Sequence, residues 1–216
     1  MSKPLISFID VEFAFEPDRP VLQGCSFQLE ANQRLALVGD NGSGKTTLLH
    51  LIVGLLHPGA GRIEAFGKPR HKEDDFHEVR RRAGLLFQDA DDQLFCPTVA
   101  EDVAFGPLNL GKPREEVWRV VGQTLDRLGL QGYQQRITYK LSGGEKRLVA
   151  LATVLAMQPD VLLLDEPAGG LDRKSARRLL DVLAELPQAM IVVSHDEEFR
   201  RATTDAELNL RNGRVT

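Results

Sequence analysis

The sequence predicts an α/β fold with a mixed β-sheet core, and two kinds of segment support this prediction. Three short apolar runs have the length and composition of buried strands: Arg34–Val38, Val161–Leu164 and Met190–Val193. Residues 98–135 and Gly143–Met157 have helical character. With 216 residues, 42% of them hydrophobic, the chain can bury a substantial core. We expect one domain over residues 1–216, with a helical insertion at about 98–157.

The N-terminal part predicts an antiparallel pair of strands. Residues 5–15 alternate between apolar and polar side chains, and a second run, Val21–Glu30, follows the turn-forming residues Glu16–Pro20. Near the C-terminus, Asn212-Gly213 is a signal for a type I′ hairpin. In between, acidic and basic residues are interleaved over Arg70–Arg82, which indicates a solvated surface segment and not a basic binding site.

The composition narrows the classes of function. Charged residues make up 27% of the chain and its net charge is −4, which gives no reason to expect nucleic acid as a partner. Cys25 and Cys96 lie far apart, do not form a metal-type spacing, and are expected to be reduced thiols. No apolar run approaches the ~20 residues that span a bilayer, so we expect a cytoplasmic protein that reaches a membrane through partners.

A glycine-rich loop follows the strand Arg34–Val38 and opens a helix at Thr46–Leu55, the context of a phosphate loop. The residues expected around a nucleotide's phosphates are Gly39, Asn41, Gly42, Ser43, Gly44, Lys45, Thr46 and Thr47. The glycines let backbone N–H groups approach the phosphates, and the helix N-terminus adds partial positive charge. Lys45 is expected to reach the β- and γ-phosphates, and the Thr46 hydroxyl to hold Mg²⁺. The loop predicts a P-loop NTPase core that binds ATP and Mg²⁺.

Two carboxylates, Asp165 and Glu166, end the apolar strand Val161–Leu164. At the end of a buried strand both side chains project at the edge of the sheet, beside the phosphate loop. Asp165 is placed to orient Mg²⁺, directly or through water. Glu166 is the candidate general base that polarises the attacking water, and the loss of such a base costs ~10²–10⁴ in rate.

The element Leu141-Ser142-Gly143-Gly144-Glu145 lies between the phosphate loop and the two carboxylates. With these three elements in this order, nearly the whole chain resembles the ABC ATPase family. The resemblance implies a P-loop NTPase core with a mixed β-sheet, an antiparallel β-subdomain and a helical subdomain. It also implies that two subunits close around two ATP molecules. In that arrangement Ser142, Gly143 and Gly144 of one subunit contact the γ-phosphate bound by the other.

The resemblance assigns roles to further positions. Gln88 lies in the loop that joins the core to the helical insertion, where its amide senses Mg²⁺ and the attacking water, and His195 contacts the γ-phosphate. Phe15 stands where a tyrosine usually stacks on adenine and keeps the ring face, with a core position as the alternative. Gly169–Asp172 matches a loop that crosses to the partner subunit. Glu145 replaces the more frequent glutamine, with an expected effect on how the closed dimer relaxes.

The segment Asp89–Pro107 resembles the ATPases of energy-coupling-factor importers, which take up cobalt, nickel and vitamins. Within that group, the run Leu141–Thr153 is most similar to the cobalt and nickel members. An acidic rim lies beside two apolar side chains: Asp89, Asp91 and Asp92 next to Leu94 and Phe95. This combination suits a groove for a helix with arginine at its tip. We expect an integral-membrane scaffold subunit to dock near Asp89–Phe95, together with a substrate-binding membrane subunit.

The sequence therefore predicts the ATP-hydrolysing subunit of an energy-coupling-factor importer for cobalt or nickel, closed by ATP as a homodimer on the cytoplasmic face of the cell membrane. A vitamin importer, and an exporter or lipoprotein-release ATPase, share the catalytic set and are the alternatives; only residues 89–107 argue against the exporters. A DNA-repair ATPase needs a long coiled coil between Lys45 and Ser142, and the sequence there has no heptads. Glu166 and His195 disfavour a regulator that only binds nucleotide.

Overall fold

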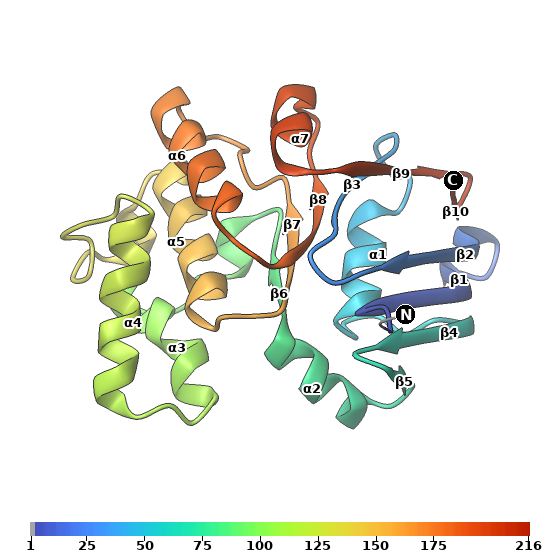
Figure 1. Ribbon diagram of the computed structural model, residues 1–216, viewed down its shortest axis with the longest axis horizontal. Coiled ribbons are helices and arrows are strands. Elements are labelled where there is room, and N and C mark those ends of the chain that lie inside the picture. Colours follow the sequence, from blue (N-terminus) through green and yellow to red (C-terminus); the bar gives the residue numbers. More distant parts are fainter. Residues whose placement is uncertain (1–2) are drawn as a thin grey trace. The chain divides into compact units, whose positions relative to one another are not determined.

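A computed structural model describes residues 3–216, and Figure 1 traces the chain through its helices and strands. The chain forms two compact units. The first contains the chain up to Leu85 together with Asp160–Leu163 and Pro187–Thr216. The second contains Leu86–Pro159 and Leu164–Leu186. The expectation of a single domain over the whole chain stays a prediction.

The first unit contains a four-stranded antiparallel sheet in the order β2-β1-β4-β5. Its strands are β1 (Ile6–Glu16), β2 (Arg19–Leu29), β4 (Ala60–Ala65) and β5 (Lys68–Arg70). β1 pairs on both sides, with Phe8 opposite Phe27 on β2 and opposite Ile63 on β4. The predicted antiparallel pair is confirmed, and only Pro17 and Asp18 separate its two strands.

A second sheet has the strand order β10-β9-β3-β8-β7-β6. Its strands are β3 (Arg34–Val38), β6 (Ala83–Leu86), β7 (Val161–Asp165), β8 (Ala189–Val193), β9 (Ala206–Arg211) and β10 (Arg214–Val215). β3 pairs in parallel with β8 and β9, whereas β9 and β10 form the predicted antiparallel hairpin. Asn212 and Gly213 in its turn have φ values of 48° and 73°, the left-handed conformation of a type I′ turn. The predicted mixed sheet is therefore confirmed.

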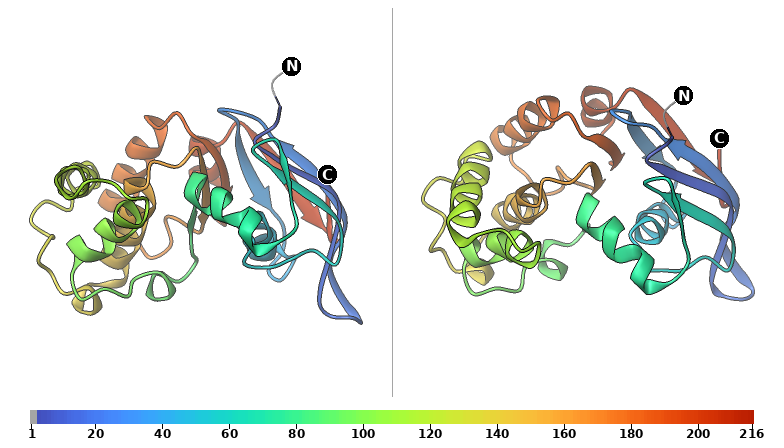
Figure 2. Two further views of the ribbon diagram at one scale, coloured as in Figure 1. Left: turned by 90° about the horizontal axis from the view of Figure 1, so that it is seen from below. Right: turned by 60° about the horizontal axis from the view of Figure 1, so that its bottom comes forward.

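The core of the first unit gathers around α1 (Lys45–Ile52). Leu48 of this helix is fully buried in one cluster with Phe8 of the antiparallel sheet and Leu35 of the mixed sheet. Figure 2 shows α1, in cyan, on the inner side of the curved strands. The packing of α1 against both sheets holds the loop that precedes it in place.

The charged segment around α2 (Glu73–Arg82) is not wholly a solvated surface, and that expectation is wrong in part. Arg70 is only 3% exposed and donates hydrogen bonds to Ala65 O at 2.8 and 3.1 Å, with an ion pair to Glu78 at 3.0 Å. Phe76 is fully buried. The interleaved charges did not indicate that Arg70 and Phe76 are buried, because a sequence does not show which carbonyl oxygens an arginine contacts.

The second unit is built mainly from helices. They are α3 (Val99–Asn109), α4 (Arg114–Arg127), α5 (Gly143–Ala156) and α6 (Arg173–Ala184), with the 3₁₀ turns η1 (Ala90–Asp92) and η2 (Thr138–Lys140). α3, α4 and α5 pack against one another (Figure 2). They bury residues such as Val103, Val121 and Val149. These three helices lie within residues 98–157, where helices were expected. The sequence did not predict α6 or the short α7 (Glu197–Thr203) of the first unit.

Membrane-spanning and metal-binding features were searched over residues 3–216. Within that range no helix is both long enough and apolar enough to cross a bilayer, and no cluster of three or more His, Cys, Asp or Glu side chains is arranged to hold a metal ion. Cys25 is buried, Cys96 is half-buried, and both are free thiols. Burial raises the pKa of each thiol to about 11, so neither is a reactive thiolate near neutral pH.

Candidate active site

The glycine-rich loop lies between β3 and α1, as its sequence predicts. Gly42 and Gly44 have φ values of 78° and 102°, a conformation that L-residues with a side chain rarely adopt. A Cβ on Gly39 would lie 2.5 Å from Leu210 O. Asn41 is exposed on the loop. The loop therefore needs glycine both for its conformation and for its close approach to β9.

Lys45 and Ser43 give this loop the properties of an anion site. The Lys45 ammonium donates to Gly39 O at 2.8 Å and to Asp40 O at 3.0 Å, so it lies across the loop that precedes it. The Ser43 hydroxyl is buried and makes no hydrogen bond within the described chain. Buried polar groups are normally paired, and the N-terminus of α1 favours negative charge. These residues fit a nucleotide's phosphates, whose oxygens would supply the partner that the Ser43 hydroxyl needs.

β3 and β8 run parallel, so the segments that follow them leave the same edge of the sheet. Thr46 and Thr47 lie in the first turn of α1. His195 follows β8 and is exposed. Its turn is held by Asp196, which caps α7 and whose N–H donates to the Ser194 hydroxyl at 3.2 Å. The phosphate loop and His195 therefore leave neighbouring strands at one edge of the first unit.

Phe15 lies on β1 with 67% of its surface exposed. Its ring meets Phe13 edge to face, with 4.9 Å between the ring centroids, so the contact orients the ring while leaving it at the surface. The alternative of a core phenylalanine is therefore wrong. An aromatic face on β1 is open to a flat ligand.

The two carboxylates follow from β7, and both belong to the second unit. Asp165 is 2% exposed, whereas Glu166 is partly exposed and has a left-handed φ of 49°. Residues other than glycine rarely adopt that conformation, and such strain concentrates at functional sites. Gly169 N donates to Glu166 O at 3.0 Å and closes the turn that holds Glu166 in place.

Arg147 on α5 is a candidate that the sequence analysis missed. Its guanidinium donates to Phe87 O at 2.8 Å and also to Gln88 O. Burial lowers the pKa of Arg147, and the carboxylates around it, including Asp165 and Glu166, oppose that shift. Arg147 thus ties the backbone at Phe87 and Gln88 to α5, and it carries a positive charge whose field the two carboxylates share. No motif spacing links these positions, so only the fold reveals the contact.

Ser142 begins α5 as its N-cap. Its hydroxyl accepts from Glu145 N at 3.3 Å and Ser142 N donates to Glu145 Oε2 at 2.8 Å, which makes a capping box. Ser142 and Gly143 are exposed. Glu145 also accepts from the Tyr133 hydroxyl at 2.6 Å and from Arg136 at 2.9 Å. Tyr133 first, and then the Ser142 backbone, lower the pKa of Glu145 to about 2, so its carboxylate is charged at neutral pH.

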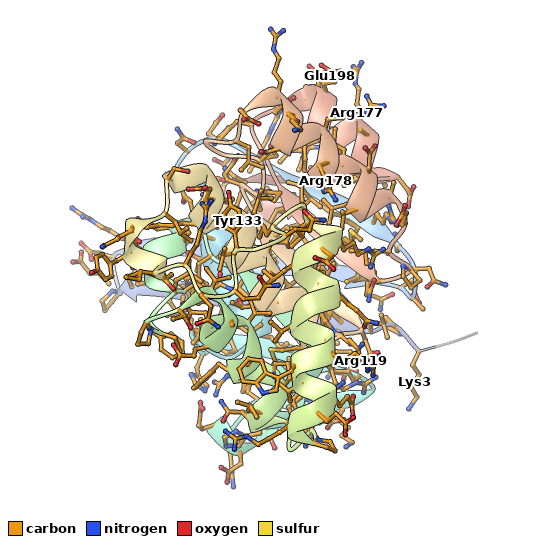
Figure 3. The ribbon with its side chains drawn as sticks, turned by 90° about the vertical axis from the view of Figure 1, so that its left-hand side faces the viewer. Lys3, Arg119, Tyr133, Arg177, Arg178 and Glu198 are labelled. Carbon is orange, nitrogen blue, oxygen red and sulfur yellow. The ribbon has the colours of Figure 1, made fainter. Side chains whose placement is uncertain are left out.

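A cavity of about 770 Å³ lies beside the start of α5 in the second unit. Its lining includes glycine backbone together with polar and charged side chains: Ser142, Gly143, Gly144, Glu145, Tyr133, Asp172, Lys174 and Arg178. Figure 3 labels Tyr133 and Arg178 among the side chains on this side of the molecule. The Asp172 carboxylate caps α6 by accepting from Ser175 N at 2.7 Å. The exposed N-terminus of α5 is therefore open to an anionic ligand.

The segment predicted to dock a membrane subunit forms η1 and the short loop after it. Asp89 caps η1 by accepting from Asp91 N at 2.9 Å, and Asp91 pairs with Lys146 of α5 at 2.5 Å. Phe95 is 66% exposed, and its ring meets Phe105 edge to face with 4.8 Å between the centroids. Acidic and aromatic side chains are therefore presented together on the surface of the second unit.

The structure brings the predicted residues together within each unit. In the first, residues 39–47 and His195 leave the same edge of the mixed sheet. In the second, Arg147 of α5 donates to Gln88 O, and the charges of Asp165 and Glu166 favour its charged form. Residues 142–144 form the exposed start of the same helix.

Comparisons with known proteins give one family and close relatives. The family model described as ABC transporter matches residues 22–169. A protein of Brucella suis named as an ABC transporter ATP-binding protein is 54% identical to this chain, over 99% of this chain and 88% of its own length. The energy-coupling factor transporter ATP-binding protein EcfA of Methanothermobacter thermautotrophicus is 40% identical, over 98% and 69% of the two chains.

Solved structures share the same fold along the whole chain. The structure of cbiO1 from Clostridium perfringens, described as part of the ABC transporter complex cbiONQ, has a TM-score of 0.86 and 32% sequence identity. The comparison covers 100% of this chain and 88% of cbiO1. The dimeric structure of MJ0796, a bacterial ABC transporter cassette, has a TM-score of 0.87 and 25% identity, covering 97% and 96% of the two chains.

Proposed function

The chain belongs to the ABC transporter family, and from this premise we propose that it powers an energy-coupling-factor importer whose cargo is cobalt or nickel. Cassettes of this family bind ATP with Mg²⁺, hydrolyse ATP to drive transport, form dimers, and work with membrane subunits. The chain is therefore an ATP hydrolase with the P-loop NTPase fold, and its hydrolysis drives transport.

Three observations support the importer type. EcfA, at 40% identity, is named as an energy-coupling factor subunit, and cbiO1 as part of a cbiONQ complex. The segment Asp89–Phe95 exposes acidic side chains beside an aromatic ring, which suits a membrane subunit that presents a helix with arginine at its tip. We place this contact at the cytoplasmic face of the cell membrane, where ATP is supplied. The similarity of residues 141–153 to cobalt and nickel members favours those ions as cargo.

In this proposal the first unit holds the nucleotide. Ser43 and Lys45 bind the β- and γ-phosphates, and Phe15 stacks on adenine. The Thr46 hydroxyl would hold Mg²⁺, Asp165 would orient the ion directly or through water, and the Gln88 amide would sense it; the ion would neutralise phosphate charge. Asn41, the loop glycines and Thr47 complete the phosphate cradle. The buried, unpaired Ser43 hydroxyl is the observation that carries this assignment, because a phosphate oxygen would satisfy it.

Hydrolysis is assigned to three side chains. Glu166 accepts a proton from the attacking water, Gln88 orients that water, and His195 contacts the terminal phosphate. The left-handed backbone of Glu166 supports a functional role, because that conformation is costly for a residue with a side chain. Ser142, Gly143 and Gly144 contact the γ-phosphate held by a second subunit, using the N–H groups at the start of α5.

Affinity capture of the protein from native membranes, followed by mass spectrometry, tests the importer type and the cargo. We expect a small integral-membrane scaffold together with a metal-binding membrane subunit. A vitamin-binding subunit in its place would keep the mechanism and replace the cargo. An exporter permease would contradict the importer assignment while leaving the ATPase intact.

Charge reversal at Asp92 tests the docking surface directly. Asp91 is unsuitable because it pairs with Lys146 of α5, so its loss would also disturb that helix. We expect Asp92→Lys to reduce recovery of the scaffold by about tenfold, the effect of losing one charged interface contact, with the rate of ATP hydrolysis unchanged. Asp74→Lys on α2, where the side chain is 95% exposed, is the matched control. Equal recovery with both variants would place the docking surface elsewhere.

A further inference from the structure

We propose that Tyr133 and Arg136 are positioning residues that act through Glu145. They set whether the Ser142 hydroxyl can bind the terminal phosphate of a nucleotide held by a second subunit. The proposal rests on the proposed function, in which residues 142–144 complete the nucleotide site of the partner.

The Ser142 hydroxyl has one hydrogen, and the structure shows where it goes. Ser142 Oγ lies 2.9 Å from Glu145 Oε2, and the charged carboxylate has no hydrogen to offer, so the hydroxyl must be the donor. The same hydroxyl accepts from Glu145 N at 3.3 Å. Ser142 therefore cannot donate to a phosphate oxygen until its hydroxyl turns away from Glu145.

The other oxygen of Glu145 is held by two donors. Tyr133 Oη lies 2.6 Å and Arg136 Nη1 lies 2.9 Å from Glu145 Oε1. The Arg136 guanidinium also stacks over the Tyr133 ring, 3.7 Å from its centroid, which fixes both side chains on the carboxylate. Counting Ser142 N and Oγ on Oε2, the carboxylate accepts four hydrogen bonds.

These contacts predict how Tyr133 and Arg136 change the hydrogen bond between Glu145 and the Ser142 hydroxyl. Donors on Oε1 draw charge away from Oε2, and so they weaken its hold on the Ser142 hydrogen. They also reduce the repulsion between the carboxylate and a phosphate at the start of α5. Removing the Tyr133 hydroxyl should tighten the hold on Ser142 and weaken the closed dimer. Glutamine at position 145 keeps an acceptor for Ser142 N, removes the charge, and should strengthen the dimer.

A double-mutant cycle in the hydrolysis-deficient Glu166→Gln protein tests this control. The readout is the dissociation constant of the MgATP-dependent dimer, measured by sedimentation. We expect Tyr133→Phe to weaken the dimer by about tenfold, the effect of one hydrogen bond to a charged group. In the presence of Glu145→Gln, the same tyrosine substitution should change the constant by less than about twofold. The affinity of the monomer for ATP should stay the same in all variants.

Tyr139→Phe is the matched control, because Tyr139 is 72% exposed and the four hydrogen bonds described on Glu145 come from other residues. It should leave the dimer unchanged. If Tyr133→Phe weakens the dimer equally with Glu and with Gln at position 145, Tyr133 has only a structural role and the proposal is overturned. If the Glu166→Gln parent binds MgATP and stays monomeric, the proposed clamp itself is wrong, and that outcome is distinct from a failed cycle.

Discussion

Glu145 shows how a single residue responds to its contacts. Its pKa is lowered from an ordinary value of 4.5 to about 2, first by the Tyr133 hydroxyl and then by the Ser142 backbone. Because the pKa is lower in the folded state, the carboxylate stabilises the fold fully above pH 4.5 and loses that effect as the pH falls toward 2. We therefore expect the stability advantage of the wild type over Glu145→Gln to shrink below pH 4.5.

Urea unfolding of the two proteins at a series of pH values measures this advantage. A difference in the free energy of unfolding that stays constant across the acidic range would contradict the pKa assignment. The same substitution is expected to tighten the ATP-bound dimer. Glu145 thus stabilises the monomer while it restrains closure.

Gly54 is a second residue with a sharp expectation. Its φ is 70°, and a Cβ there would lie 2.2 Å from the ring of Phe76, which is fully buried. Gly54→Ala should destabilise the protein by about 2–4 kcal/mol, from overpacking and left-handed strain together. Gly111 has a similar φ of 78° with no atom within 4 Å of a Cβ. Gly111→Ala should therefore destabilise the protein only through backbone strain, by about 1–2 kcal/mol. If thermal unfolding shows the same loss of stability for Gly54→Ala and Gly111→Ala, the predicted collision with Phe76 is excluded.

At the scale of elements, α5 anchors the segments on both sides of η1. Arg147 binds the carbonyl oxygens of Phe87 and Gln88, and Gln93 binds Ala150 O at 3.2 Å. The helix that begins at the Leu-Ser-Gly-Gly element therefore holds the backbone of the segment that carries Gln88 and the docking surface. A displacement of α5 would therefore move the segment that carries Gln88, and a displacement of that segment would move α5.

Arg147→Ala should disturb hydrolysis more than binding. Loss of its two hydrogen bonds releases the Gln88 backbone, so we expect kcat to fall by about 10–100-fold, the cost of a misplaced catalytic group, with little change in ATP affinity. Arg119→Ala on α4 is the control, since Arg119 (labelled in Figure 3) is exposed and donates to Gln123 of the same helix at 3.4 Å. An unchanged kcat in Arg147→Ala would show that Arg147 is not needed to position Gln88 for hydrolysis.

The elements that the sequence predicted are those with a strong local signal. The apolar runs of β3, β7 and β8, the Asn212-Gly213 turn and the glycine-rich loop each carry their signal within a few residues. α7 has seven residues, too few for a periodic pattern to stand out. α6 does carry a helical pattern, with Leu179, Val182 and Leu183 buried on one face, and the sequence analysis missed it.

The site divides in the same way. Motifs indicated the phosphate loop, the carboxylates and Ser142 because their residues are adjacent in sequence. Tyr133, Arg136 and Arg147 act through side chains that reach another segment, and no local pattern marks such contacts. The burial of Arg70 was missed for the same reason.

At the scale of the whole molecule, the two elements assigned to the proposed clamp lie on different units. The phosphate loop belongs to the first unit and the Leu-Ser-Gly-Gly element to the second. In the proposed clamp, the loop of one subunit is completed by residues 142–144 of another. In the same proposal, hydrolysis with Glu166 as general base opens the clamp, and the segment Asp89–Phe95 passes the motion to the membrane subunits.

Sedimentation of Glu166→Gln with MgATP tests this clamp most directly. The variant keeps every group assigned to binding and loses the general base, so we predict a stable dimer with MgATP and a monomer with ADP. Glu115→Gln, an exposed substitution on α4, should hydrolyse ATP and fail to accumulate the dimer. A Glu166→Gln protein that binds MgATP and remains monomeric would contradict the clamp.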